Sequence, residues 1–241
     1  MNLKSYTLAI NISTLKTRAL TAVFFVIIML LGLLTNAWAF IALFLVVLVG
    51  CLLEFSKIIK LIYGRRYFFY SSFSLIYIFM PVLMMLDLGV DIEDANGDFI
   101  FQYSPLFPCA IIFSVWINDT MAYLVGSLIG KTPFSRISPK KTWEGTIGGA
   151  ILCVAILGLA GRFIPGGNQL DTIDWIILSS LIALFGTLGD LFESKLKRTA
   201  GLKDSGRILP GHGGFLDRFD SMLIATPFAW FFIRIFLISG A

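Results

Sequence analysis

The chain has 241 residues, of which 57% are hydrophobic and only 14% are charged, and its mean hydropathy is +0.87. This composition excludes a soluble globular domain, because the surface over a core of this size would need many more polar residues. The formal net charge is +4. We expect the lipid bilayer, and no nucleic acid, as the partner of the apolar surface.

Seven apolar segments approach the length of about 20 residues that a helix needs to cross a hydrocarbon core of roughly 30 Å. They predict an all-α, polytopic membrane bundle of about seven transmembrane helices, with six to nine allowed, because an open sheet in lipid would leave backbone groups unpaired. The first segment is interpreted as a retained span and not as a cleaved signal peptide, since no small-residue cleavage site follows it. Pro81 and a Ser-rich start weaken the third. In chain order the predicted spans are 19–35, 36–53, 68–86, 106–126, 146–164, 174–192 and 217–239.

The distribution of basic residues predicts the orientation of these spans. Seven alternating spans place nearly all of the 19 Lys and Arg residues on one side, in the N-terminus, the 54–67 loop, the 127–145 loop and the 193–218 segment. By the positive-inside rule that side is cytosolic, with the N-terminus inside and the C-terminus outside. We therefore expect a multi-pass protein of a cell membrane, such as a bacterial inner membrane. The carboxylates expected at this face are functional candidates, because charge at membrane depth is costly: Glu54, Asp119, Glu144, Asp190, Glu193, Asp204, Asp217 and Asp220.

The cysteines and glycines of the spans have ordinary explanations. Cys51, Cys109 and Cys153 all lie in apolar runs, which favours small buried hydrophobic side chains over a disulfide, a zinc site or a nucleophile. The small-residue face at 145–149 would suit a homodimer, but such faces serve packing within one chain equally well. Its glycines are Gly145, Gly148 and Gly149.

A first polar patch covers residues 118–145. Asn118 and Asp119 interrupt an apolar span, where a buried carboxylate needs a cation or a metal as its partner. Downstream, the sequence Ser-Pro-Lys-Lys-Thr-Trp-Glu-Gly offers two ammonium groups and two hydroxyls for phosphate, although a solvated basic loop is the alternative. The candidate residues of the patch are Asn118, Asp119, Ser138, Lys140, Lys141, Thr142 and Glu144.

A second polar patch covers residues 186–220. Ser194 and Lys197 follow Asp190 at helical spacing, so one helix face carries a carboxylate, a hydroxyl and an ammonium group. Asp217 and Asp220 are three residues apart and share a face, although two aspartates at a helix start also serve as caps. Three such carboxylates suit Mg²⁺, and a two-metal site would suit displacement at phosphorus.

The loop between these helices is rich in glycine. Pro210 to Gly214 offers backbone N–H groups that can surround phosphate oxygens, although glycines also form plain turns. His212 is the only histidine, and it would serve as a structural hydrogen-bonding group, as a ligand-binding group or in proton transfer. The nearby cations would face the lipid surface or bind a polyphosphate; they are Lys197, Arg198, Lys203 and Arg218.

Together these residues resemble the phosphatidate cytidylyltransferases (CDP-diacylglycerol synthases). The signature of that family is Ser-x-x-Lys-Arg, four residues, Lys-Asp-x-Gly, then Pro-Gly-His-Gly-Gly and Asp-Arg-x-Asp. The resemblance is strong over about 113–228, and the chain is short between about 60 and 105 compared with family members, which usually have more spans. The signature is met here by Ser194, Lys197, Arg198, Lys203, Asp204, Gly206, Pro210, Gly211, His212, Gly213, Gly214, Asp217, Arg218 and Asp220.

The resemblance implies transfer of CMP from CTP to phosphatidic acid, with CDP-diacylglycerol and pyrophosphate as products and Mg²⁺ as the cofactor. It divides the chain into an N-terminal membrane region, 1–105, and a catalytic membrane region, 106–241. Asp190, Asp217 and Asp220 would hold metal and, with Lys197, Arg198, Lys203 and His212, form the catalytic group. The attacking phosphate is already an anion, which favours His212 as a binding group over a base. The implied substrate-binding residues are Asn118, Asp119, Ser138, Lys140, Lys141, Thr142, Glu144, Ser194, Asp204, Gly211, Gly213, Gly214 and Arg218.

Two other functions fit parts of the sequence. The first is a related CTP-dependent transferase that acts on another lipid phosphate, which the headgroup residues would not distinguish. The second is an ion-coupled transporter with Asp119 and Asp190 as intramembrane ion sites. Against the transporter, the charges gather on one face, and no pair of broken helices recurs in two halves.

Overall fold

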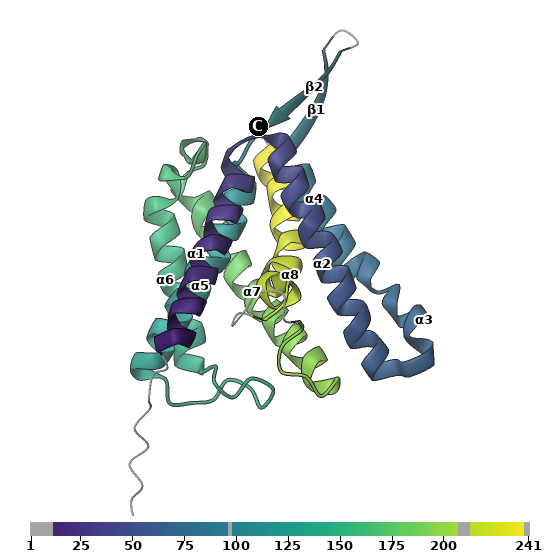
Figure 1. Cartoon of the computed structure of the whole chain (residues 1–241). Coiled ribbons are helices and arrows are strands. Elements are labelled where there is room, and N and C mark those ends of the chain that lie inside the picture. The colour runs from purple at the N-terminus through teal and green to yellow at the C-terminus, as the bar shows by residue number, and fades with distance from the viewer. Residues whose placement is uncertain (1–11, 96–97, 207–212, 239–241) are drawn as a thin grey trace, which may run out of the picture.

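The computed structural model describes residues 12–95, 98–206 and 213–238 of the chain. Figure 1 shows a bundle of helices with a hairpin of two strands projecting from one end, while the loop after α5 and the end of α7 lie at the other end. The α-helices are α1 (Ile12–Leu34), α2 (Ala37–Tyr63), α3 (Tyr67–Ser71), α4 (Met80–Gly89), α5 (Leu106–Ile129), α6 (Trp143–Ala160), α7 (Thr172–Thr199) and α8 (Leu216–Phe232). Short 3₁₀ turns cover Gly64–Arg66, Gly161–Phe163 and Gly167–Gln169, and π-helical turns cover Leu75–Phe79 and Ile233–Ile238.

The lengths of the helices confirm a polytopic membrane bundle. In the described part of the chain, 5 segments are long and apolar enough to cross a membrane, and the shorter apolar helices Ala19–Leu34 and Leu75–Gly89 join them. Each of the seven predicted spans overlaps one of these segments. The long segments are Ala37–Ser71, Leu106–Ile129, Trp143–Phe163, Thr172–Thr199 and Leu216–Ile238.

The second and third predicted spans are corrected by the structure. The second does not end at 53, because α2 continues to Tyr63 and ends at Gly64, where φ is 57°. Its last turns keep burying apolar side chains, so Glu54 lies on a helix and not in a loop. The third, 68–86, is divided into α3, a π-helical turn and α4. The break between α3 and the π-helical turn lies at the serines that weakened the prediction. There the hydroxyl of Ser72 donates to the backbone carbonyl of Phe69 at 2.6 Å.

A small antiparallel hairpin, which the sequence did not predict, accompanies the all-α bundle. Strand β1 (Val90–Ala95) pairs with β2 (Asp98–Tyr103), in register from Val90 opposite Tyr103 to Ala95 opposite Asp98. Its base is tied to the bundle because the Tyr103 hydroxyl donates to the carbonyl of Leu33 at 2.5 Å. Nearby, Arg234 Nε donates to Asp87 Oδ2 at 2.9 Å. Asp87 follows the predicted span 68–86 and Arg234 lies near the end of the predicted span 217–239. Both of these spans were predicted to end on the side opposite the basic loops, so the pairing agrees with the predicted orientation.

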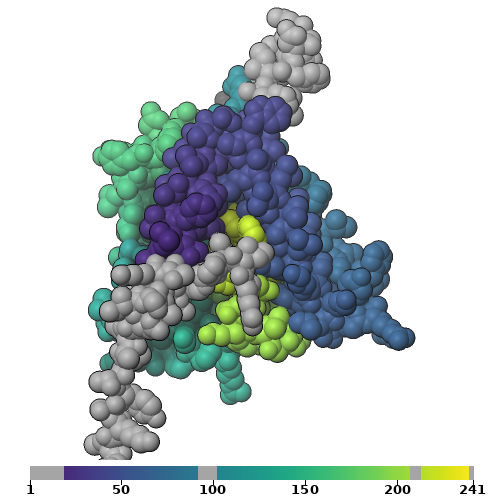
Figure 2. Space-filling view, viewed as in Figure 1, coloured from purple at the N-terminus to yellow at the C-terminus, as the bar shows by residue number. Residues whose placement is uncertain are grey.

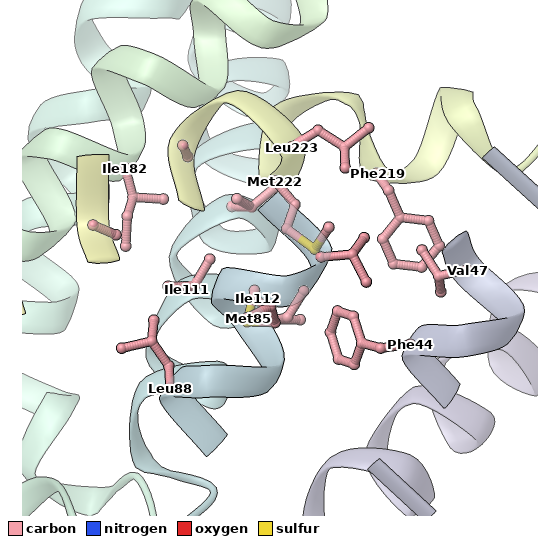
Figure 3. Packing of buried hydrophobic residues seen from close by; sticks show 14 of the residues in the cluster. Phe44, Val47, Met85, Leu88, Ile111, Ile112, Ile182, Phe219, Met222 and Leu223 are labelled. Atoms are coloured by element: carbon pink, nitrogen blue, oxygen red, sulfur yellow. The ribbon is translucent and has the colours of Figure 1, made fainter. Parts of the chain in front are cut away.

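The core lies where α2, α4, α5, α7 and α8 meet. Figure 3 shows Phe44 and Val47 of α2 facing Phe219 of α8, with side chains of α4 and α5 beside them. Phe44 is fully buried, and little of α8 is visible between α1 and α2 in the space-filling view (Figure 2). The three cysteines are buried free thiols, as the apolar runs around them predicted. Helix α8, which carries two of the predicted site aspartates, is therefore held from several sides.

Glycines bring α5 and α6 into close contact. A Cβ atom on Gly149 would lie 2.5 Å from the backbone nitrogen of Ala122, and one on Gly145 would lie 2.8 Å from its carbonyl oxygen. A Cβ on Gly148 would come within 2.7 Å of Val125 Cγ1. These glycines serve packing within the chain, so they no longer support a homodimer, and dimerisation stays a prediction.

Candidate active site

A polar cavity of about 510 Å³ lies between α5, α7, the start of α8 and the loop that leads into α6. It brings the two polar patches of the sequence together, although residues 146–185 separate them in the chain. Half of the predicted site residues line it. They are Asn118, Asp119, Ser138, Lys140, Lys141, Thr142, Asp190, Asp217, Arg218 and Asp220.

One ion pair connects the two patches directly. Lys141 Nζ contacts Asp190 Oδ2, and Ser194 Oγ donates to Asp190 Oδ1 at 3.2 Å. Lys141 and Asp190 are both about one quarter exposed, so the pair stands at the wall of the cavity and not in the core. Asp190 therefore holds Lys141 at the cavity wall with one carboxylate oxygen, while its other oxygen accepts from Ser194.

The loop that carries the lysines is held by Glu144. Its carboxylate accepts from the backbone nitrogens of Lys131 and Thr132 at 3.2 Å and from Thr132 Oγ1 at 2.8 Å. Thr142 caps α6, since its hydroxyl oxygen accepts from the backbone nitrogen of Gly145 at 3.1 Å. Glu144 does not line the cavity, so its position suits loop support better than the substrate contact that we predicted.

Asp217 binds Lys197 of α7 and the backbone of two described residues that lie between α7 and α8, Ser205 and Gly214. Its Oδ1 accepts from Lys197 Nζ at 2.5 Å, and its Oδ2 accepts from the backbone nitrogens of Ser205 at 2.9 Å and Gly214 at 2.8 Å. Lys197 also contacts Oε2 of the fully buried Glu193. Lys197 is only 9% exposed and does not line the cavity, and of its two carboxylate partners among the described residues Asp217 is the one that does.

Glu54 is a contributor that the motif reasoning left out of the site. It is 1% exposed, and its Oε2 accepts from Ser205 Oγ at 2.7 Å and from the backbone nitrogen of Leu216 at 2.9 Å. A Cβ atom on Gly206 or Gly214 would collide with its carboxylate, so these glycines leave room for it. The signal in the sequence was a carboxylate directly after an apolar span. Nothing near position 54 indicated that its partners were more than 150 residues away.

Several other predicted residues lie outside the cavity. Arg198 Nη1 donates to the carbonyl of Leu202 at 2.9 Å, while Lys203 and Asp204 are exposed. Gly213 has a φ of 84°, a conformation that favours glycine. Gly211 and His212 lie outside the described residues, so their predicted roles stay predictions.

The carboxylates of the cavity are of a type that binds cations, but those described do not lie close enough together to chelate one. Among the described residues, no set of three or more His, Cys, Asp or Glu side chains is close enough to hold a metal ion. Asp190 and Asp217 already have protein donors on both oxygens. Asp220 differs, because it is 8% exposed, accepts from the backbone nitrogen of Ser221 at 2.7 Å and forms no ion pair with a described residue. A buried carboxylate at a polar cavity without a cationic partner suits a bound cation.

Comparison with known proteins covers this same region. Residues 101–236 match the model of the cytidylyltransferase family. A phosphatidate cytidylyltransferase of Staphylococcus aureus (strain COL) is 51% identical over 116 residues, which are 47% of this chain and 43% of the relative. The chloroplastic phosphatidate cytidylyltransferase 4 of Arabidopsis thaliana is 45% identical over 118 residues, which are 48% of this chain and 29% of the relative. The matches thus span less than half the length of these relatives. The family match contains every residue of the cavity but not Glu54.

Proposed function

Because the chain belongs to the cytidylyltransferase family, we propose that it transfers CMP from CTP to phosphatidic acid and releases pyrophosphate. The observation that carries this proposal is the meeting of Lys141 and Asp190 in a cavity that Lys140 and Arg218 also line. Two polyanionic substrates must approach each other in this reaction, and cations on one cavity wall would reduce their repulsion. The names of the relatives support the choice of phosphatidic acid as the acceptor.

The proposed chemistry is an in-line displacement at phosphorus. A phosphate oxygen of the lipid attacks the α-phosphorus of CTP, the bond from that phosphorus to the bridging oxygen breaks, and pyrophosphate leaves with the electron pair. The nucleophile is already an anion, so the chain needs to orient it more than to deprotonate it. Lys140, Lys141 and Arg218 would bind phosphate oxygens, with Lys141 held in place by Asp190.

We propose Mg²⁺ as the cofactor of this reaction, as one ion or two. Asp220 is the best-placed ligand, since its carboxylate has no cationic partner among the described residues. Asp190 and Asp217 would join it only by releasing a donor that each now holds. When bound, the metal would neutralise charge on the phosphate oxygens.

The proposed location of the site is the cytosolic face of a cell membrane. The cavity lies at the end of the bundle that carries the basic loops, and those loops are expected inside by their charge. CTP is available on that side. The chain is a multi-pass membrane protein, and the side on which it exposes this cavity can be tested by labelling a single introduced cysteine in the 131–142 loop of sealed, oriented vesicles.

Purified protein with radiolabelled CTP and defined lipid acceptors would test the function. We expect label in the lipid fraction and release of pyrophosphate only when phosphatidic acid and Mg²⁺ are both present. Labelling of another lipid phosphate in place of phosphatidic acid would support the related transferase. Absence of labelled lipid from folded protein with every acceptor, or ion flux into vesicles without CTP, would refute the proposal.

A further inference from the structure

A second, larger cavity of about 940 Å³ runs between α6 and α7. Its walls are apolar and include Ile147, Ile151 and Ala155 of α6 and Ile176, Leu184 and Leu188 of α7. Ile151 is 63% exposed and Leu184 is 57% exposed, so the groove is open on its outer side. We call it the α6–α7 groove.

The groove is continuous with the polar cavity. Thr146 and Thr187 line both of them, so the apolar groove begins where the polar cavity ends. Thr146 follows Thr142, which caps α6 beside the lysines of the polar cavity. A molecule with a phosphate among those lysines could therefore extend an apolar tail into the groove without leaving the protein surface.

The hydroxyl groups along α7 do not make the groove polar. Ser180 Oγ donates to the carbonyl of Ile176 at 2.6 Å, and Thr187 Oγ1 donates to the carbonyl of Ala183 at 2.8 Å. These bonds within one helix satisfy both donors, so neither needs a polar ligand. The groove is accordingly suited to a hydrocarbon chain.

The length of the groove also suits a lipid tail. From Thr146 to Leu159, α6 rises about 20 Å at roughly 1.5 Å per residue. One leaflet accounts for about half of a hydrocarbon core of roughly 30 Å. The groove is therefore long enough to follow one acyl chain from the headgroup region to the middle of the bilayer.

From this continuity we infer that the α6–α7 groove binds one acyl chain of the lipid phosphate while its headgroup occupies the polar cavity. The inference rests on the proposed function for its substrate and adds the place of the tail. A cavity of about 760 Å³ between α2 and α8 shares no lining residue with the polar cavity. A cavity of about 360 Å³ between α1 and α5 does reach Asp119 and Arg218, so the experiment must separate it from the groove.

Photolabelling tests the inference without requiring turnover. The probe is phosphatidic acid with a diazirine at the middle of one acyl chain, added to the full chain in detergent micelles or nanodiscs. We expect adducts on α6 and α7 within the groove, and competition by unlabelled phosphatidic acid. Adducts confined to α1 and α5, or spread evenly over all lipid-facing helices, would overturn the inference.

A matched pair of variants supplies the second readout. Ile151→Trp would place an indole ring in the groove and narrow the path of an acyl chain, whereas Leu152→Trp places the same side chain on the next residue, which is 40% exposed and does not line the groove. We expect Ile151→Trp to lose the groove adducts and to raise the KM for a long-chain phosphatidic acid roughly tenfold. The KM for CTP and the turnover of a six-carbon, water-soluble analogue should stay unchanged, and Leu152→Trp should match the unaltered chain.

The outcomes distinguish this inference from the proposed function. Groove adducts on a chain that never labels lipid from CTP would support the groove and refute the transferase. Equal losses with long and short acceptors would overturn the groove while leaving the transferase intact. A change in oligomeric mass with Ile151→Trp, without loss of adducts, would show that a second copy of the chain covers the groove and would also overturn the inference.

Discussion

Replacing Lys197 with methionine tests the arrangement behind the polar cavity. Lys197 is the described cation that contacts both Glu193 and Asp217, and the exposed fractions of these three side chains are 11%, 0% and 7%. Removing one partner from a buried ion pair costs about 3–5 kcal/mol, because the other partner keeps its charge without compensation. We therefore expect Lys197→Met to lower the free energy of unfolding by about that amount, as measured by denaturant titration in detergent micelles.

We expect substitution of the two carboxylates to restore different amounts of the stability that Lys197→Met loses. Glu193 Oε1 has no hydrogen-bond partner among the described residues, whereas Asp217 keeps two backbone donors after Lys197 is lost. Adding Glu193→Gln to Lys197→Met should therefore restore most of the lost stability, and adding Asp217→Asn should restore less. Lys195→Met is the matched control, since Lys195 is an exposed neighbour on the same helix.

Two results would contradict the structural role that we assign to Lys197. If Lys197→Met were as stable as the unaltered chain and lost only affinity for CTP, Lys197 would bind substrate phosphate, as the signature alone suggested. Equal rescue by both carboxylate substitutions would also contradict the reasoning, because it would mean that the backbone donors contribute nothing to Asp217.

Three further substitutions have defined outcomes. Asp220→Asn should abolish formation of CDP-lipid in the radiolabel assay with little change in unfolding, and normal turnover would remove Asp220 from the proposed metal site. Glu54→Ala leaves the hydroxyl of Ser205 and the backbone N–H of Leu216 buried without their acceptor. The free energy of unfolding should therefore fall by about 2–5 kcal/mol. An unchanged melting temperature would show that these two hydrogen bonds do not stabilise the fold. Gly149→Leu should prevent packing against Ala122 and give a chain that aggregates on extraction, unlike Leu152→Ala, and a monodisperse Gly149→Leu protein would contradict the close contact of α5 and α6.

The sequence predicted the membrane spans well because hydropathy reports directly on burial in lipid. It predicted the end of α2 wrongly for the same reason, since Glu54 and Lys57 lower the hydropathy without breaking the helix. The hairpin at 90–103 was missed because its charged residues resemble those of an ordinary outer loop.

The sequence predicted which residues line the site better than it predicted which of them contact each other. Helical spacing and the family signature selected most of the residues that line the cavity, since within each of the two polar patches those residues lie close together in the chain. The pairing of Lys141 with Asp190 and the burial of Lys197 depend on how α5, α7 and α8 pack, and no local pattern reports that. Glu144 was assigned to the substrate, although its position at the start of α6 lets it hold a loop.

The contact of Glu54 with Ser205 and Leu216 has a consequence for biosynthesis. The bonded residues are 151 and 162 positions apart in the chain. At a translation rate of about 5–20 residues per second, the carboxylate on α2 waits roughly 10–30 s for its donors to be made. Until then the Glu54 carboxylate lacks the two hydrogen bonds that it accepts in the complete chain. A chain that ends before position 205 would carry Glu54 on α2 without either of these donors, so the bond between the first third of the chain and the start of α8 can form only late in synthesis.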